Sequence, residues 1–195
     1  MGSMLPLVLA STSPYRRQLL ERLGVPFDRA APGVDESSQT SADTTPIEIA
    51  QTLARAKAEA VAAQRPGAVV VGSDQVASID GAILGKPGTA AAAADQLRRL
   101  RGRGHELITA VAIAHPGGMA EFVDVTRLWM RDLDDGEIDR YVAADQPLDC
   151  AGSYKIERLG VALFAAVECE DQTAITGLPL LRLSAELRQL GYRIP

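Results

Sequence analysis

The sequence predicts an α/β protein built on a mixed β-sheet. Residues 68–73 form a run of small and β-branched side chains, which is typical of a strand buried on both faces. Residues 5–10 form a second apolar run, and a helix pattern follows it directly. Residues 106–114 and 119–130 alternate like antiparallel strands and are joined at Pro116-Gly117-Gly118. Strands of both kinds in one chain imply a mixed sheet.

A helix is expected directly after the first strand. Ser13 is a natural N-cap, Pro14 suits the first helical position, and Gly24 ends the helix. The first turn carries Arg16 and Arg17, although cations are disfavoured beside the positive end of a helix dipole. A bound anion would satisfy the free N–H groups and both guanidinium groups; a solvated basic turn is the alternative. Because successive helical residues diverge by about 100°, one phosphate can meet both arginines only at an irregular helix start.

A second helix is predicted from about residue 45 to 63. Thr45-Pro46-Ile47-Glu48 forms a capping box with proline at the first helical position. The expected apolar face consists of Ile47, Ala50, Ala54 and Val61. By helical spacing Lys57 lies in the middle of that face. Its ammonium must either extend to solvent or meet an anion, and the spacing leaves both alternatives open.

An acid and a lysine follow the buried strand at 68–73. Ser73-Asp74-Gln75 is expected at the carboxyl end of this strand, where α/β proteins usually place metal ligands and catalytic bases. Gly85-Lys86-Pro87 then fixes a cation on a short rigid turn. This combination suits a metal-assisted reaction on phosphates, although an ordinary strand end is the alternative.

The remaining elements complete the α/β order. A short return strand is expected at 82–84, helices at 89–101, 134–144 and 178–190, and a strand at 161–167. Four arginines close the first of these helices, where they complement the negative end of its dipole. We interpret them as a solvated helix terminus, with phosphate binding as the alternative: Arg98, Arg99, Arg101 and Arg103.

Composition excludes some classes of protein. The 195 residues contain 47% hydrophobic and 23% charged side chains, which is ordinary for a globular protein. A net charge of −5 argues against nucleic-acid binding through a general basic field. Cys150 and Cys169 show no metal-ligand spacing and suggest a reducing, cytoplasmic setting. His105 and His115 stand far apart, and we expect no catalytic or metal role for either.

The ends of the chain give two further expectations. Residues 4–195 are interpreted as a single domain, and Met1-Gly2-Ser3 as a cloning scar before the natural start at Met4. No segment is apolar for long enough to cross a membrane, and no signal peptide is visible, so no membrane partner is expected.

Seven short segments spread over nearly the whole chain form a set. They are residues 10–17 (Ala-Ser-Thr-Ser-Pro-Tyr-Arg-Arg), 34–36 (Val-Asp-Glu), 56–58 (Ala-Lys-Ala), 72–75 (Gly-Ser-Asp-Gln), 85–87 (Gly-Lys-Pro), 150–154 (Cys-Ala-Gly-Ser-Tyr) and 177–179 (Gly-Leu-Pro). No single segment is decisive, but the ordered set is specific. Taken together, the segments resemble the Maf family of nucleoside triphosphate pyrophosphatases.

The resemblance implies hydrolysis of a nucleoside triphosphate between the α- and β-phosphates, with a divalent cation such as Mg, Mn or Co. Asp74 would be the proton acceptor and would also contact the metal. Glu36 would be a second carboxylate at the metal. The triphosphate would be held by Ser11, Arg16, Arg17, Lys57 and Lys86. The implied fold is the inosine triphosphatase-like one, an elongated mixed sheet flanked by helices with two lobes around a cleft. Family precedent also implies a homodimer.

Three positions resemble the branch of the family that acts on 7-methyl-GTP: Tyr15, Gln75 and Glu157. An aromatic face opposite the cationic methylated base would gain stacking and cation–π attraction. The carboxylate of Glu157 could accept hydrogen bonds from the guanine N1–H and exocyclic amine. The alternatives are that Tyr15 is a packing residue and that Glu157 pairs with Lys155 or Arg158 on the surface.

The implied function is therefore removal of modified nucleotides from the pool, by conversion of 7-methyl-GTP to 7-methyl-GMP and diphosphate. Two other functions compete with it, a dTTP/UTP pyrophosphatase of the same family and a non-catalytic nucleotide-binding regulator of cell division. The polar stretch 35–45 is interpreted as a flap over the cleft. Residues 169–176 depart from the family's glycine- and asparagine-containing pattern, which leaves the geometry of that loop open.

Overall fold

The computed structural model describes residues 4–36 and 44–195. The proposed scar at 1–3 and most of the proposed flap at 35–45 therefore lie outside the described residues. The chain divides into two compact units, in agreement with the two lobes expected from the sequence. The first comprises Met1–Asp74, Thr109–Asp124 and Asp171–Pro195, and the second Gln75–Ile108 and Val125–Glu170. The cleft and the single-domain assignment stay predictions.

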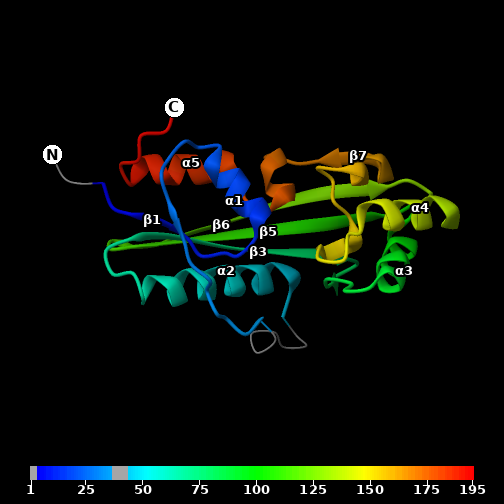
Figure 1. The fold of residues 1–195 in the computed structure, drawn as a ribbon, viewed down its shortest axis with the longest axis horizontal. Coiled ribbons are helices and arrows are strands. Elements are labelled where there is room, and N and C mark those ends of the chain that lie inside the picture. The colour runs from blue at the N-terminus through cyan, green and yellow to red at the C-terminus, as the bar shows by residue number, and fades with distance from the viewer. Residues whose placement is uncertain (1–3, 37–43) are drawn as a thin grey trace. The chain divides into compact units, whose positions relative to one another are not determined.

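The described strands form one hydrogen-bonded sheet (Figure 1). Within the described residues its order is β2-β1-β3-β5-β6-β7, with β4 paired to β3. β1 runs parallel to β2 and β3, whereas β4 runs antiparallel to β3 and β7 antiparallel to β6, so the predicted mixed sheet is confirmed. The strands are β1 (Leu7–Leu9), β2 (Asp28–Arg29), β3 (Val69–Ile79), β4 (Ala82–Leu84), β5 (Gly104–His115), β6 (Gly118–Met130) and β7 (Phe164–Glu168).

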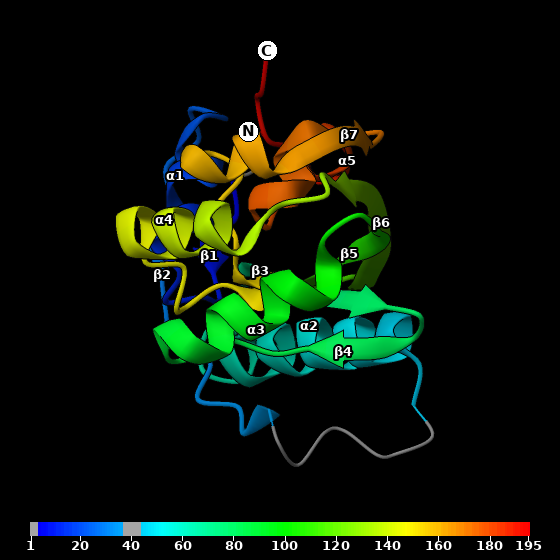
Figure 2. The same ribbon diagram turned by 90° about the vertical axis from the view of Figure 1, so that its right-hand side faces the viewer.

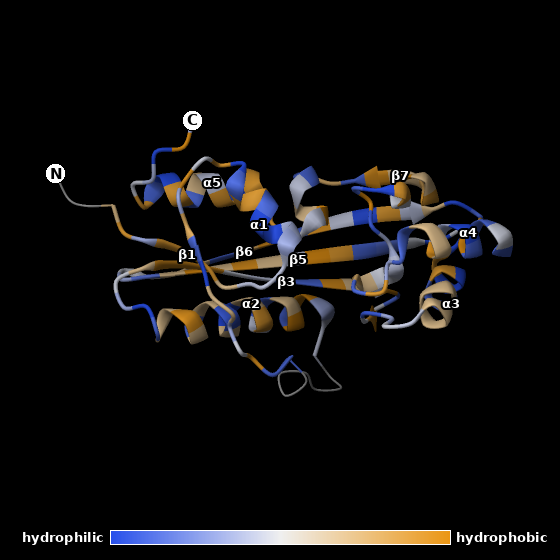
Figure 3. Ribbon diagram, viewed as in Figure 1, coloured by the Kyte–Doolittle hydropathy of each residue, from blue (hydrophilic) through white to orange (hydrophobic). Residues whose placement is uncertain are grey.

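In the first unit, helices cover both faces of the sheet. Helix α2 (Pro46–Ala62) lies on one face, and α1 (Pro14–Glu21) and α5 (Leu180–Gln189) lie on the other (Figure 1). The central strands carry long apolar stretches (Figure 3), and the buried residues of α2 are apolar except for Lys57. The largest fully buried side chains of the layer that contains α1 and α5 are five leucines and one isoleucine: Leu9, Leu20, Ile113, Leu178, Leu183 and Leu187. Burial of these side chains is the main stabilising term for this unit.

Helix α2 touches strand β3 backbone to backbone at Gly72. A Cβ atom added at Gly72 would lie 2.6 Å from the amide nitrogen of Ala58 and would also overlap the carbonyl oxygen of Ala54. Only a residue without a side chain fits this approach. The capping box of Thr45 and Glu48 fixes the start of the same helix, as the sequence predicts.

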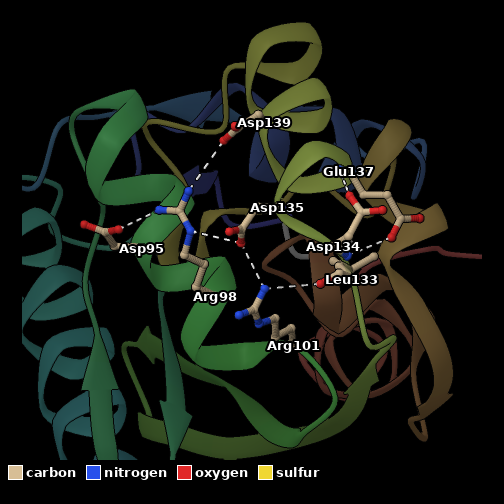
Figure 4. A network of polar contacts seen from close by, with 8 residues as sticks. All are labelled: Asp95, Arg98, Arg101, Leu133, Asp134, Asp135, Glu137 and Asp139. Atoms are coloured by element: carbon tan, nitrogen blue, oxygen red, sulfur yellow. Dashed lines mark hydrogen bonds and ion pairs between the residues drawn. The ribbon is translucent and has the colours of Figure 1, made fainter.

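In the second unit, helices α3 (Ala90–Leu100) and α4 (Asp135–Asp145) lie side by side (Figure 2) and are joined by ion pairs (Figure 4). Arg98 lies 3.3 Å from Asp135, and Arg101 lies 2.9 Å from the same carboxylate. Asp95 and Asp139 also pair with Arg98. The arginine run is therefore not a merely solvated helix terminus, because these two guanidinium groups connect α3 to α4.

Three local expectations from the sequence are wrong. The strand predicted at 68–73 continues to Ile79, because the polar residues after Gly72 stay within the largely buried strand β3. The strand at 161–167 begins only at Phe164, and Leu159–Leu163 forms a 3-10 turn. Ile47 is 42% exposed, so it does not belong to the buried face of α2. No helix within the described ranges is long and apolar enough to cross a membrane.

The second unit also contains a buried aromatic cluster. The ring of His105 lies 5.5 Å from Tyr154 and 6.0 Å from Phe164, measured between centroids. Its Nε2 atom is 3.0 Å from the hydroxyl of Tyr154. Burial lowers the pKa of His105 to about 4, so its imidazole is neutral at pH 7.

We expect Gly72→Ala to lower the free energy of unfolding by about 3 kcal/mol, because backbone atoms of α2 cannot move aside as a flexible side chain could. Urea unfolding followed by circular dichroism measures this change. Gly85→Ala is the matched control, since an added Cβ there has open space. Its expected cost is within about 0.5 kcal/mol. Equal losses in the two variants would contradict the close-contact argument.

The buried His105 makes the free energy of unfolding depend on pH. Between pH 6.5 and about 4 the unfolded histidine is protonated and the folded one is not, so stability falls as the pH falls through that window. We expect this group to account for a loss of about 2 kcal/mol between about pH 7.5 and pH 5 in urea unfolding of the wild type. His105→Phe should show a smaller loss over the same interval. An unchanged difference between the two pH values would overturn this assignment.

Candidate functional site

Two carboxylates meet one buried ammonium in the first unit. Lys57 Nζ on α2 lies 2.6 Å from Asp74 Oδ1 on β3 and 2.6 Å from Glu36 Oε1. The side chains of Lys57 and Asp74 are each 9% exposed, whereas that of Glu36 is 54% exposed. Of the two alternatives for Lys57, the structure shows the second, because its ammonium meets anions and does not extend to solvent. The close contact at Gly72, two residues before Asp74, holds α2 against this strand.

Asp74 lies within β3 and not at its carboxyl end, which corrects the expectation from the sequence. Burial raises the pKa of Asp74, while the positive charges of Lys57 and Arg16 oppose that shift and Glu36 adds to it. The ionised form of this carboxyl group therefore depends on its cationic neighbours. A carboxylate whose pKa is raised by burial and lowered by nearby cations is suited to accept a proton.

Arg16 is held at the start of α1 by the loop before α5. Its Nε donates to the carbonyl oxygen of Gly177 at 3.1 Å, and the hydroxyl of Ser73 donates to the same oxygen at 2.9 Å. Burial lowers the pKa of Arg16, and the carboxylates of Asp74 and Glu36 oppose this change. Arg16 therefore belongs to the same electrostatic group as Lys57 and Asp74.

Arg17 points elsewhere. Its Nε pairs with Glu21 Oε1 at 2.7 Å on the exposed side of α1, and its side chain is 53% exposed. The start of α1 has the expected cap, since the hydroxyl of Ser13 accepts from the amide of Arg16. On this regular helix the two arginines diverge, as the helical geometry requires. A phosphate contact of Arg17 stays a prediction.

Ser11 and Tyr15 lie around the same helix start. Ser11 is buried, and its Oγ accepts a hydrogen bond of 3.1 Å from the amide of Ser13. Tyr15 is half-buried on the first turn of α1. The first unit thus brings together the predicted residues Glu36, Lys57, Asp74 and Arg16, with Ser11 on the segment that leads into α1.

Three predicted residues belong to the second unit, which is described by itself. Lys86 is exposed after β4, Gln75 is half-buried on β3, and Glu157 is exposed in the turn that follows Tyr154. The neighbours proposed as surface partners for Glu157 pair with other carboxylates. Lys155 lies 3.1 Å from Asp149, and Arg158 lies 3.2 Å from Asp145.

Sequence reasoning missed the residues that hold the loop beside Arg16. The carboxylate of Asp171 accepts from Thr173 N at 2.8 Å and from Leu181 N at 2.7 Å, so it ties the loop to the start of α5. Ser73 and Gly177 both belong to motifs of the sequence, but those motifs do not predict that the Gly177 carbonyl accepts from both Ser73 and Arg16. The two bonds join residues separated by 104 and 161 positions, which no local pattern reveals.

The donors fit a hard divalent cation shared with a substrate. Asp74 and Glu36 offer carboxylate oxygens, which Mg²⁺ prefers, and such sites commonly use one or two carboxylates together with substrate phosphates. In the part of the chain that the structure describes, no group of three or more His, Cys, Asp or Glu residues could hold a metal ion. The fit is therefore to a cation that phosphate oxygens help to hold, and not to a cage made by protein alone.

Proteins with solved structures share this fold. The Ham1 protein of Staphylococcus aureus matches with a TM-score of 0.54 at 15% identity, over 94% of this chain and 99% of that one. A HAM1 protein from Coxiella burnetii matches with a TM-score of 0.50 at 17% identity, over 95% and 100% of the two chains. At these identities the likeness concerns the fold alone.

Curated relatives are much more similar in sequence. A protein of Xanthomonas oryzae pv. oryzae named 7-methyl-GTP pyrophosphatase is 49% identical over 98% of this chain and 100% of its own length. A protein of the same name from Aromatoleum aromaticum is 50% identical over 97% of each chain. The family described as Maf-like protein matches residues 6–190. Since that match spans nearly the whole sequence, the chain belongs to the Maf-like protein family.

Proposed function

We propose that this protein hydrolyses 7-methyl-GTP to 7-methyl-GMP and diphosphate, and so clears a modified nucleotide from the pool. The observation that carries the proposal is the buried contact of Lys57 with Asp74 and Glu36. Full-length relatives at 49% and 50% identity that carry the name 7-methyl-GTP pyrophosphatase support the choice of substrate.

Asp74 is the proton acceptor in this proposal. A water oxygen forms a bond to the α-phosphorus, the bond from that phosphorus to the bridging oxygen breaks, and the water proton passes to Asp74. The diphosphate leaves with the bridging oxygen. This step needs the ionised carboxylate of Asp74. The positive charge of Lys57 favours that form, because it opposes the rise in the pKa of Asp74 that burial causes.

The remaining work is positioning and charge neutralisation. Arg16 and Lys57 supply positive charge in the first unit, and Ser11, Arg17 and Lys86 are proposed as further phosphate contacts. Asp74 and Glu36 would hold a divalent cation, which neutralises phosphate charge when bound. Family membership suggests such a requirement, and Mg, Mn and Co are the candidates.

Base recognition is assigned to Tyr15, Gln75 and Glu157. Tyr15 would stack on the cationic methylated guanine, and Glu157 would accept its N1–H and exocyclic amine. A cytoplasmic setting is part of the proposal, and a homodimer stays a prediction from family precedent.

The first experiment measures diphosphate release from 7-methyl-GTP, GTP, dTTP, UTP and CTP with each of the three metals. Preference for 7-methyl-GTP would support both the chemistry and the base contacts. Preference for dTTP or UTP would keep the mechanism and remove the base assignment. Folded protein without turnover on any of them would favour the nucleotide-binding regulator instead.

We expect Asp74→Asn to lower kcat at least about 100-fold, because an amide cannot take the proton from water. The fold should persist, since Lys57 keeps its contact with Glu36. Steady-state kinetics and thermal unfolding of the same samples measure the two effects. Asp139→Asn, which changes an exposed carboxylate on α4, should retain wild-type turnover. Near-normal kcat in Asp74→Asn would eliminate the proposed role.

We expect Glu157→Gln to lower kcat/KM for 7-methyl-GTP about tenfold, because an uncharged amide loses the attraction to the cationic base. The reaction on dTTP should change little, since the proposed contact with a methylated guanine is absent there. The readout is the ratio of kcat/KM values for the two nucleotides. Glu168→Gln on β7 is the matched control and should leave the ratio unchanged. An unaltered ratio in Glu157→Gln would remove this residue from base recognition.

A further inference from the structure

We propose that Gln96 is a positioning residue that joins the turn carrying Lys86 to the segment carrying Glu157. No motif singled out in the sequence contains Gln96, and it does not belong to the proposed contacts with the nucleotide. The inference rests on the proposed function, because Lys86 and Glu157 are assigned there to the two ends of the substrate. All of the contacts that carry it lie within the second unit.

The side-chain amide of Gln96 bonds in two directions. On α3, its Nε2 donates to the carbonyl oxygen of Gly85 at 2.9 Å. Its Oε1 accepts from the hydroxyl of Ser153 at 2.6 Å. A primary amide is the side chain that offers a donor and an acceptor on one planar group. The two bonds therefore fix the amide plane and link two chain segments that lie 68 residues apart by number.

The first bond acts on Lys86 through one peptide unit. The carbonyl of Gly85 and the amide of Lys86 belong to the same rigid plane, so fixing the oxygen fixes where the Lys86 backbone begins. Glycine at position 85 has no Cβ and would otherwise be free to rotate. A second contact, from Gly88 N to the carbonyl of Leu148 at 3.0 Å, holds the far end of this turn.

The second bond acts on the segment that leads to Glu157. Gly152 and Ser153 both adopt left-handed backbone conformations, with φ of 77° and 63°. Such a conformation is unfavourable for serine, so the surrounding contacts must hold it. Ser153 is fully buried, and its hydroxyl bond to Gln96 is one such contact.

The backbone conformation at Ser153 sets the path of the chain into the turn that contains Glu157. The hydroxyl of Tyr141 accepts from Lys155 N at 2.9 Å, and Arg158 N donates to the carbonyl of Lys155 at 3.0 Å. Glu157 lies inside the turn that this last bond closes. One amide on α3 thus determines the starting geometry of both the proposed phosphate contact and the proposed base contact.

The test uses Gln96→Met, which keeps the volume and removes both bonds. We expect KM for 7-methyl-GTP to rise about tenfold, with kcat within about threefold of wild type, because Asp74, Lys57 and Glu36 are untouched. The preference for 7-methyl-GTP over GTP should fall as well. Asp95→Asn, an exposed change on the same helix, is the control and should keep wild-type constants.

Two further variants separate the two bonds. Gln96→Glu keeps an acceptor for Ser153 and loses the donor to Gly85, so KM should rise alike for 7-methyl-GTP and GTP. Ser153→Gly removes the hydroxyl and tolerates the left-handed backbone, so the preference for 7-methyl-GTP should fall while KM for GTP stays near wild type. Circular dichroism confirms that each variant is folded.

A double-mutant cycle with Lys86→Ala distinguishes positioning from general destabilisation. If Gln96 acts through Lys86, the KM effect of Gln96→Met shrinks in the Lys86→Ala background. Additive effects, or wild-type constants in folded Gln96→Met, would overturn the inference while leaving the proposed function intact. Absence of turnover in the wild type would instead overturn the proposed function. In that case, the same cycle is measured as the rise in melting temperature that inorganic tripolyphosphate gives each variant. This measurement alone then tests the coupling between Gln96 and Lys86.

Discussion

Lys57 carries a charge on the inner face of a helix that packs against a sheet, and a charge in that position requires compensation. Desolvation of an unpaired ammonium is costly, so Lys57 is stable there only because Asp74 and Glu36 both approach its Nζ atom. The same contacts determine the state of Asp74, whose pKa burial would otherwise raise further. The helix position, the charge of the acid and the nearby Arg16 therefore depend on one another.

The resulting group suits phosphate chemistry because its charges are already in place. Arg16 is oriented by Gly177, and Lys57 is oriented by two carboxylates. Polar groups fixed before the substrate arrives need little reorganisation during the reaction, and such preorganisation is the main source of electrostatic catalysis. The second unit shows the same principle at Lys155, whose amide donates to the hydroxyl of Tyr141 and whose Nζ donates to the carbonyl oxygen of Gln146.

Local patterns predicted much of this arrangement. The capping box of Thr45 and the helical spacing identified α2 and placed Lys57 on its buried face, because helix periodicity depends only on nearby residues. The length of β3 was not predictable in this way, since buried hydrogen-bond partners allow Ser73 and Asp74 to continue a strand that polarity alone would end. The bonds from Arg16 to Gly177 and from Gln96 to Ser153 join residues far apart in the chain. They depend on the tertiary fold, which one sequence without its structure does not reveal.

The contact of Gly72 with Ala54 and Ala58 has a consequence for how this sequence can vary. The three positions share one space, so growth at any of them would require the helix to withdraw from the strand and Lys57 to leave its carboxylates. Residues on the outer face of α2, such as Gln51 and Glu59, are exposed. A library that randomises α2 would therefore tolerate change on the outer face, whereas positions 54 and 58 of the inner face would accept only the smallest side chains.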